Sequence, residues 1–237
     1  MEMKSENITV IGCGRWGTFI AWYLNTLRFR VTLYGRKSSA NMERLINDRR
    51  NEFLILPDEI SLSTDINTVL DSDIIVISIG TQSLRGLMEE LQKLRLKNKT
   101  FVICMKGIEI GSGKRLSEII SEYIDPGSSV AVWLGPGHVE EFINGIPNCM
   151  VIDSDDEETK KHLVTLFQGP LIRFYFGSDL IGNEIGAASK NVIGIAAGIL
   201  DGLKISSLKG ALMSRGTREI SELIKAMGGN ELSAYGL

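Results

Sequence analysis

The sequence predicts an α/β fold, with a doubly wound, mostly parallel sheet followed by an all-helical domain. Short apolar runs alternate with helix-compatible segments up to Phe176, which is typical of parallel strands joined by helices. After Gly177 the pattern becomes helical only. A glycine-rich turn also follows the first apolar run directly. We therefore expect a first domain over residues 1–177 and a helical second domain over residues 178–237.

Composition places the chain among globular proteins. Of 237 residues, 43% are hydrophobic and 23% are charged, which allows a sizeable core. The net charge of −3 gives no sign of nucleic-acid binding. The three cysteines are far apart and predict no disulfide framework, and cysteines and histidines lack the spacing of metal ligands. Because the N-terminus also lacks the apolar core of a signal peptide, we predict a cytoplasmic protein.

The first predicted strand, residues 8–11, leads directly into a glycine turn and a helix. Gly12, Gly14 and Gly17 have the GxGxxG spacing that lets backbone N–H groups approach a pyrophosphate at a helix N-terminus. An ordinary glycine turn is the alternative for so short a motif. The order of strand, turn and helix favours dinucleotide binding by a Rossmann-type sheet.

The second predicted strand, Arg30–Tyr34, ends where such folds distinguish NAD from NADP. An acidic residue there would hold the ribose 2′-hydroxyl of NAD, whereas this chain has Arg36 and Lys37. Two cations suit the 2′-phosphate of NADP, and arginine can bind phosphate bidentately. A solvated basic loop is the alternative. We therefore predict NADPH as the cofactor and leave NADH open.

Later segments continue the alternation of strands and helices. Strands are predicted at residues 73–79, 100–105, 129–134, 149–152 and 172–176. Helices are predicted at residues 41–50, 81–93 and 155–167. Ligands of parallel sheets bind at the carboxyl ends of strands. Lys106 is therefore a candidate for holding phosphate or a substrate oxygen, although a surface lysine fits the pattern equally well. Gly135 and Gly137 form a small-residue turn after another strand, and His138 beside them is a candidate base.

Residues 179–203 are rich in Gly, Ala, Ile and Leu but carry Lys190 and Asn191 side by side. Loss of hydration in such surroundings lowers the pKa of a lysine and suits it to proton transfer. A membrane span is the alternative, but the central lysine and nearby carboxylates disfavour it. We predict a buried helix with a functional lysine, followed by an amphipathic helix that ends at Gly228.

As a set, these segments resemble the NAD(P)-dependent glycerol-3-phosphate dehydrogenase family. The resemblance rests on GxGxWG at residues 12–17, TQSLR at 81–85, KGIE at 106–109, GP at 135–136, and above all ASKNVIGIAAGILDGL followed by ALMSRGTREI. It covers essentially the whole chain in order. It implies an oxidoreductase that reversibly reduces dihydroxyacetone phosphate to sn-glycerol 3-phosphate for phospholipid precursor synthesis.

The resemblance also implies roles for individual residues. Lys190 matches the family's proton donor and acceptor at the substrate oxygen, and Lys106 matches a lysine that touches both cofactor and substrate. Positions that contact the cofactor in the family are matched by Arg15, Trp16, Arg36 and Val139. Gly135 and Gly137 lie in the family's substrate-side turn. Asn191 is expected to hold the lysine or a substrate oxygen.

The family pattern continues beyond Leu237 with a turn bearing Gly and Asp and then an Arg-Asn pair that binds substrate phosphate and cofactor. The resemblance therefore implies that the helical domain is truncated. An incomplete helical domain exposes apolar surface, so a homodimer is a candidate assembly. Two alternative functions stay open: a non-catalytic NADPH-binding protein, and a related dehydrogenase of a small hydroxy acid.

Overall fold

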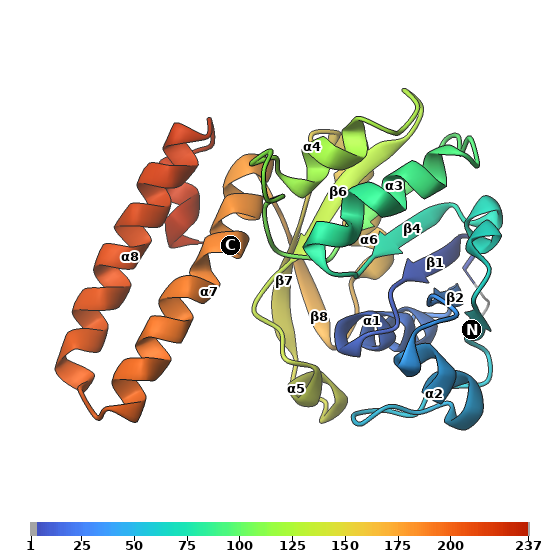
Figure 1. The fold of residues 1–237 in the computed structure, drawn as a ribbon, viewed down its shortest axis with the longest axis horizontal. Helices are drawn as coiled ribbons and strands as arrows, with labels where there is room; N and C mark the ends of the chain where they lie inside the picture. The colour runs from blue at the N-terminus through green and yellow to red at the C-terminus, as the bar shows by residue number, and fades with distance from the viewer. Residues whose placement is uncertain (1–3, 237) are drawn as a thin grey trace.

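A computed structural model describes residues 4–236 of the chain. Figure 1 shows a twisted sheet with helices on both faces and a pair of long helices standing beside it. The strands are β1 (Asn7–Ile11), β2 (Arg30–Tyr34), β3 (Ser61–Ser63), β4 (Ile74–Ile77), β5 (Thr100–Ile103), β6 (Ser129–Leu134), β7 (Asn148–Asp153) and β8 (Ile172–Phe176). The α-helices are α1 (Arg15–Thr26), α2 (Ala40–Asp48), α3 (Leu84–Gln92), α4 (Leu116–Ser121), α5 (Val139–Ile143), α6 (Glu157–Phe167), α7 (Leu180–Gly202) and α8 (Ser206–Ala226). Short 3-10 helices are η1 (Ile66–Asp71), η2 (Thr81–Ser83) and η3 (Glu231–Tyr235).

The eight described strands form one sheet in the order β3-β2-β1-β4-β5-β6-β7-β8. Neighbouring strands are parallel except β6 and β7, where Val132 pairs with Asp153 in antiparallel register. The reversal follows from α5, a five-residue helix that packs near α1 instead of crossing the sheet. The predicted doubly wound, mostly parallel sheet followed by helices is confirmed.

The strand order reverses between β1 and β4, because the chain builds outward from β1 in one direction and from β4 in the other. Their register joins Ile8 to Ile74 and Ile11 to Ile77, so the two strands end at the same level. In open α/β sheets, the carboxyl ends of the strands beside such a reversal leave a crevice that binds ligands. The strand order therefore predicts a ligand site at this edge of the sheet.

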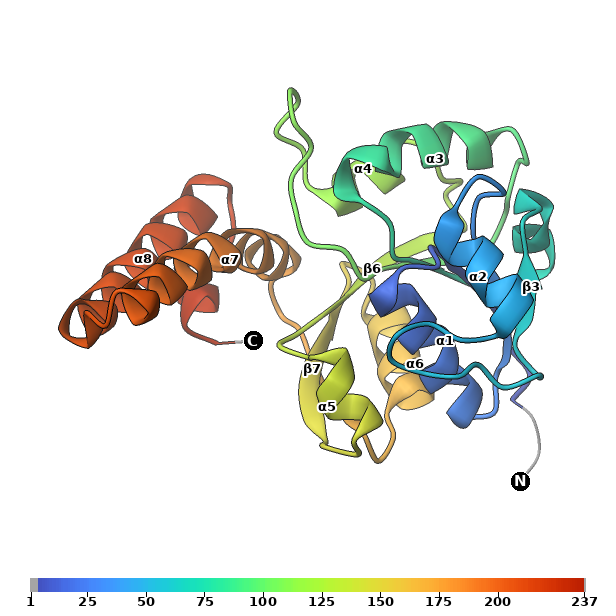
Figure 2. The same ribbon diagram turned by 60° about the horizontal axis from the view of Figure 1, so that its bottom comes forward.

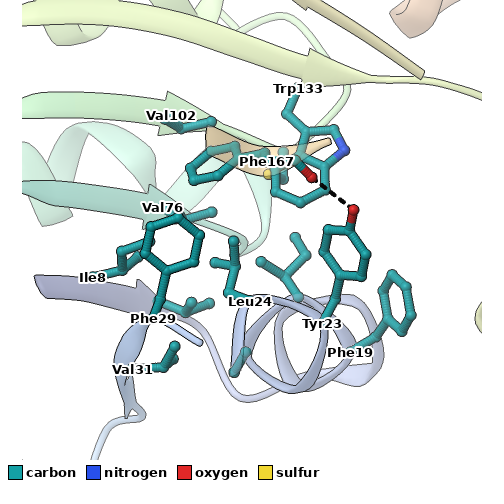
Figure 3. Packing of buried hydrophobic residues seen from close by; sticks show 14 of the residues in the cluster. Ile8, Phe19, Tyr23, Leu24, Phe29, Val31, Val76, Val102, Trp133 and Phe167 are labelled. Atoms are coloured by element: carbon teal, nitrogen blue, oxygen red, sulfur yellow. Dashed lines mark hydrogen bonds between the residues drawn. The ribbon is translucent and has the colours of Figure 1, made fainter. Parts of the chain in front are cut away.

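Each face of the sheet has its own hydrophobic cluster, with α1 and α6 on one side and α3 and α4 on the other (Figure 2). In the first cluster Phe19, Tyr23, Trp133 and Phe167 pack together (Figure 3). The buried Tyr23 hydroxyl donates a hydrogen bond of 2.6 Å to the carbonyl oxygen of Phe167. Its polar group is therefore satisfied, as buried groups usually are. Two filled clusters hold the strands, and hence the loops at their ends, in place.

The long helices α7 and α8 form an antiparallel hairpin (Figure 1), and only the first half of α7 is packed against the sheet domain. Ile185 is fully buried, whereas Val192, Ile195 and Ile199 are 66%, 68% and 58% exposed. The expectation of a buried helix over residues 179–203 is therefore wrong for its second half, which extends away from the sheet and contacts α8. Between residues 4 and 236, the structure contains no helix with the length and apolar character needed to cross a membrane.

Candidate active site

A cleft of about 810 Å³ lies at the carboxyl ends of β1, β2 and β4, where the strand order reverses. Its volume is in the range of small-molecule and cofactor sites. The residues that line it come from the ends of these strands, from the turns that follow them and from helices α1, α2 and α3, and they include Gly12, Gly14, Trp16, Arg36, Ser78, Gly80 and Gln82. Four of the predicted cofactor-binding residues, Gly12, Gly14, Trp16 and Arg36, are thus brought together in one cleft.

The glycine turn shapes the floor of this cleft through its backbone. Gly12 has a φ of +117°, and a Cβ atom there would lie 2.1 Å from the carbonyl oxygen of Ser78. A Cβ atom at Gly17 would lie 1.9 Å from the carbonyl oxygen of Gly12, so these two glycines are required by close packing. Gly14 has nothing within 4 Å of its Cβ position and faces open space. It begins α1 without a side-chain cap, which leaves the first N–H groups of the helix available to an anion.

Arg36 follows β2 and lines the cleft, whereas its neighbour Lys37 is exposed outside the lining. Within residues 4–236 neither side chain takes part in a salt bridge. The lining also contains one carboxylate, Glu90 of α3. A free guanidinium in the cleft fits a phosphate group carried by a dinucleotide.

The other predicted cofactor-binding residues lie outside this lining. The Arg15 guanidinium pairs with the carboxylate of Glu140 and lies 4.2 Å from the centre of the Phe53 ring. Val139 begins α5 and is 3% exposed, as part of the core. Gly17 acts through the close packing described above.

The predicted substrate-side residues meet at the neighbouring strand ends. Lys106 follows β5, and its Nζ atom donates a hydrogen bond of 3.3 Å to the carbonyl oxygen of Gly135, which follows β6. Partial burial lowers the pKa of Lys106, and the positive charge of Lys190 lowers that pKa further, so the two ammonium groups lie within electrostatic range of each other. Partial burial also lowers the pKa of Lys190. The structure therefore brings Lys106, Gly135 and Lys190 together beside the cleft.

The turn after β6 also reaches the cofactor side. A Cβ atom at Gly137 would lie 2.3 Å from the Phe142 ring and 3.2 Å from the Trp16 ring, so a larger residue would disturb that packing. His138 is exposed at the start of α5, and Asn191 is exposed on α7 next to Lys190. The substrate-side turn thus contacts Trp16, which itself lines the cleft.

The first turns of α7 are fixed to the sheet domain by buried polar groups. The buried carboxylate of Asp153, at the end of β7, accepts hydrogen bonds from the Asp179 backbone N–H at 3.0 Å and from Asn183 Nδ2 at 2.7 Å. Lys160 Nζ donates to the same carboxylate at 3.3 Å. Asp179 in turn accepts from the hydroxyl of Ser233 at 2.6 Å, which joins α7 to η3. The helix that carries Lys190 is therefore held at its start.

Ser78, Gly80 and Gln82 are among the residues of the cleft that were not predicted as site residues. All three follow β4, which ends two residues earlier than the strand predicted at residues 73–79, and the carboxyl end of that strand was a signal that could have indicated them. Gln82 also holds the loop after Lys106: its Nε2 atom donates to the carbonyl oxygen of Ile108 at 2.9 Å, and its Oε1 atom accepts from the Ile110 N–H at 2.9 Å. In the part of the chain that the structure describes, no group of three or more His, Cys, Asp or Glu side chains is arranged to hold a metal ion.

A dinucleotide-sized cleft at the reversal of strand order, with paired lysines beside it and a helical segment behind them, defines the class of nicotinamide-dependent dehydrogenases. Models for the N-terminus and the C-terminus of NAD-dependent glycerol-3-phosphate dehydrogenase match residues 7–160 and 179–237. The chain belongs to the NAD-dependent glycerol-3-phosphate dehydrogenase family.

Individual relatives agree with the family models. The chain is 39% identical over 239 residues to the glycerol-3-phosphate dehydrogenase (NAD(P)+) of Prosthecochloris aestuarii, covering 97% of this chain and 71% of that protein. It is 37% identical to the enzyme of the same name from Thermoanaerobacter sp., covering 97% and 70%. A crystal structure of glycerol-3-phosphate dehydrogenase from Coxiella burnetii superposes with a TM-score of 0.89 at 26% identity, covering 98% of this chain and 72% of that chain.

Proposed function

We propose that this chain reversibly reduces dihydroxyacetone phosphate to sn-glycerol 3-phosphate, with NADPH preferred and NADH accepted. The convergence of Lys106 and Lys190 beside the cleft carries the proposal, because the reaction needs a hydride donor and a proton donor at one carbonyl group. The product is the backbone of phospholipids, and we place the reaction in the cytoplasm.

In this proposal the cofactor lies in the cleft between β1, β2 and β4. The backbone at Gly12 and Gly14, together with the N-terminus of α1, binds the pyrophosphate. Arg36 binds the 2′-phosphate of NADPH, and Trp16 contacts the cofactor from the side of the substrate turn. We also assign to the cofactor site four residues outside the lining of the cleft: Arg15, Gly17, Lys106 and Val139. NADPH, when bound, supplies the hydride that the carbonyl carbon of the substrate receives.

Lys190 supplies the proton. Its ammonium group donates to the carbonyl oxygen as negative charge develops there, and the neutral amine left behind accepts the proton in the reverse direction. The lowered pKa of Lys190 favours this exchange, because both protonation states become accessible closer to neutral pH than for an ordinary lysine.

Lys106 contributes a second positive charge at the same place. Two ammonium groups suit a phosphorylated substrate better than a neutral one, since each stabilises negative charge at the site. Gly135 holds Lys106 through its carbonyl oxygen, and we assign Gly137 and Asn191 to the substrate side of the site. The proposal therefore favours a small phosphorylated ketone over an unphosphorylated one.

We further propose that residues 1–177 form the dinucleotide-binding domain and residues 178–237 the helical substrate domain. The change from sheet to helix between Phe176 and Leu180 supports this division. A homodimer is our proposal for the assembly, supported by the exposed apolar side chains of Val192, Ile195 and Ile199.

Initial rates of NADPH oxidation on three substrates test the proposal. We expect turnover of dihydroxyacetone phosphate, much slower turnover of unphosphorylated dihydroxyacetone, and none of a small 2-oxo acid. Preferred turnover of the 2-oxo acid would instead assign a dehydrogenase of hydroxy acids. Saturable NADPH binding with no turnover of any substrate would assign a nucleotide-binding role.

A further inference from the structure

Glu184 is a buried carboxylate on α7 that the reaction proposed above does not use. The residue is 6% exposed, and its carboxylate is fully occupied by the start of α4. Arg115 Nη1 donates to it at 2.6 Å, the Ser117 backbone N–H at 2.9 Å and the Ser117 hydroxyl at 2.5 Å. Burying an ion is costly unless it is paired and hydrogen-bonded, so this arrangement joins α7 firmly to α4.

Arg115 also ends the loop that begins at Lys106. Ile108 and Arg115 form an antiparallel bridge, and the Glu109 N–H donates to the carbonyl oxygen of Lys114 at 3.0 Å, so the loop is closed on itself. Movement of Arg115 would therefore displace Ile108, which is only two residues from Lys106. The hydrogen bond between Arg115 and Glu184 is thus connected, through the loop, to the segment that carries Lys106.

The second lysine lies on the same helix as Glu184. Lys190 lies six positions after Glu184, which corresponds to about 9 Å along the helix axis and about 120° around it. The two side chains consequently leave α7 on different faces: Glu184 contacts the start of α4, and Lys190 lies within electrostatic range of Lys106. A helix held at Glu184 is fixed both in rotation and in translation, and this fixes the place of Lys190.

We propose that Glu184 is a positioning residue that sets Lys190 and Lys106 relative to each other, by holding Arg115 and Ser117. This inference rests on the proposed function, which assigns the two lysines to one substrate site. The polar anchors at Asp153 hold the start of α7, whereas Glu184 lies closer to Lys190 and is joined to the loop of Lys106.

The variant Glu184→Gln tests the proposal, because its amide oxygen can still accept from Ser117 while Arg115 keeps, among the described residues, only the Glu118 carboxylate, 3.4 Å away, as an ionic partner. The first measurement is the pH dependence with which the Lys190 and Lys106 amines react with a small acylating reagent, read by mass spectrometry. We expect the pKa of Lys190 to rise toward that of an ordinary lysine as the helix shifts into solvent.

The second measurement is turnover by Glu184→Gln. We expect kcat to fall about tenfold to a hundredfold, because small misplacements of reacting groups slow a reaction to this extent. The dissociation constant of NADPH should stay within about twofold of wild type.

Two further variants test the ion pair between Glu184 and Arg115. Arg115→Met removes the other side of the ion pair and should shift the Lys190 profile in the same direction. Glu184→Asp keeps the charge but shortens its reach, and we expect an effect between wild type and Glu184→Gln. Partial recovery of the Lys190 profile and of kcat in Glu184→Asp would show that the charge at this position matters, which a loss of folding would not explain.

The control is Tyr23→Phe, which removes a buried hydrogen bond of 2.6 Å on the opposite face of the sheet. It should lower the unfolding temperature without changing either amine profile. The proposal is overturned if Glu184→Gln lowers only the unfolding temperature and leaves both lysine profiles and kcat at wild-type values. If wild type does not reduce dihydroxyacetone phosphate but the amine profile still shifts in Glu184→Gln, then the positioning role stands and the proposed function fails.

Discussion

The two halves of the site are built in different ways. The cofactor cleft is shaped by backbone that only glycine allows, as at Gly12 and Gly17. The lysine site depends on side chains from separate elements, with Lys106 after β5, Gly135 after β6 and Lys190 on α7. A backbone cradle needs one short motif, whereas paired charges need the whole sheet and the anchored helix to bring them together. Steric changes should therefore abolish cofactor binding at the cleft. Changes in charge or position should instead impair the lysine site.

The largest effect on cofactor binding is expected where the backbone has no room for a side chain. In Gly12→Ala, the new Cβ atom would lie 2.1 Å from the Ser78 carbonyl oxygen at a φ of +117°. We expect loss of NADPH binding and a decrease of about 1–3 kcal/mol or more in the free energy of unfolding. Fluorescence titration and thermal unfolding would measure the two effects. Gly14→Ala is the control, because its Cβ position is open and folding should be retained. Wild-type NADPH affinity in Gly12→Ala would contradict the steric explanation.

The two halves of α7 should respond very differently to the loss of apolar side chains. Ile185→Ala removes a fully buried side chain and should cost about 2–5 kcal/mol of unfolding free energy. Val192→Ala, at 66% exposure, should change it by less than about 0.5 kcal/mol. Urea unfolding of both variants would measure the difference. Equal losses at the two positions would show that the second half of the helix is buried in solution.

Charge substitutions at the cleft sharpen the comparison, because Arg36 is the guanidinium in its lining. Arg36→Gln should weaken NADPH binding about tenfold through loss of a charged hydrogen bond, and leave NADH binding unchanged. Lys37→Gln is the matched control, since Lys37 lies outside the lining. Equal weakening of both cofactors by Arg36→Gln would be inconsistent with a 2′-phosphate contact.

The smallest effect concerns the pair of lysines. The charge of Lys190 lowers the pKa of Lys106, so Lys190→Met should raise the pKa of Lys106 by removing that repulsion. The amine of Lys106 would then react more slowly with acylating reagents at a given pH below its pKa. Lys114→Met is the control, because the Lys114 ammonium pairs with Glu122 and does not act on Lys106. An unchanged Lys106 profile in Lys190→Met would mean that the two groups are not close in solution.

The sequence predicted most of the fold, because glycine turns and continuous apolar strands are local signals. The strand Arg30–Tyr34 was predicted with the bounds that the structure gives it. Among the elements that were missed, β3 has three residues and α4 has six, which is too short for either periodicity to emerge. The antiparallel pairing of β7 was also not predicted, because the direction of a strand depends on where its connection packs.

For the site as well, features with local signals in the sequence could be predicted, and features that depend on long-range contacts could not. The glycine turn and Arg36 could be predicted from adjacent residues, and the lysine of α7 from its unusual surroundings. The bonds of Gln82 to Ile108 and of Glu184 to Arg115 join segments far apart in the chain, so no local pattern indicates them. The exposure of the second half of α7 was likewise not predicted, because composition alone does not tell which part of an apolar helix contacts the sheet.

The most direct test of the account is NADPH oxidation with dihydroxyacetone phosphate by wild type and by Lys190→Ala, with NADPH binding measured on the same samples. We predict turnover by wild type, a fall in kcat of about 10²–10⁴-fold in the variant, and unchanged NADPH binding. Such a result would separate the proton donor from the cofactor cleft, as their construction implies. Equal turnover by the two proteins would contradict the assignment of Lys190 as the proton donor.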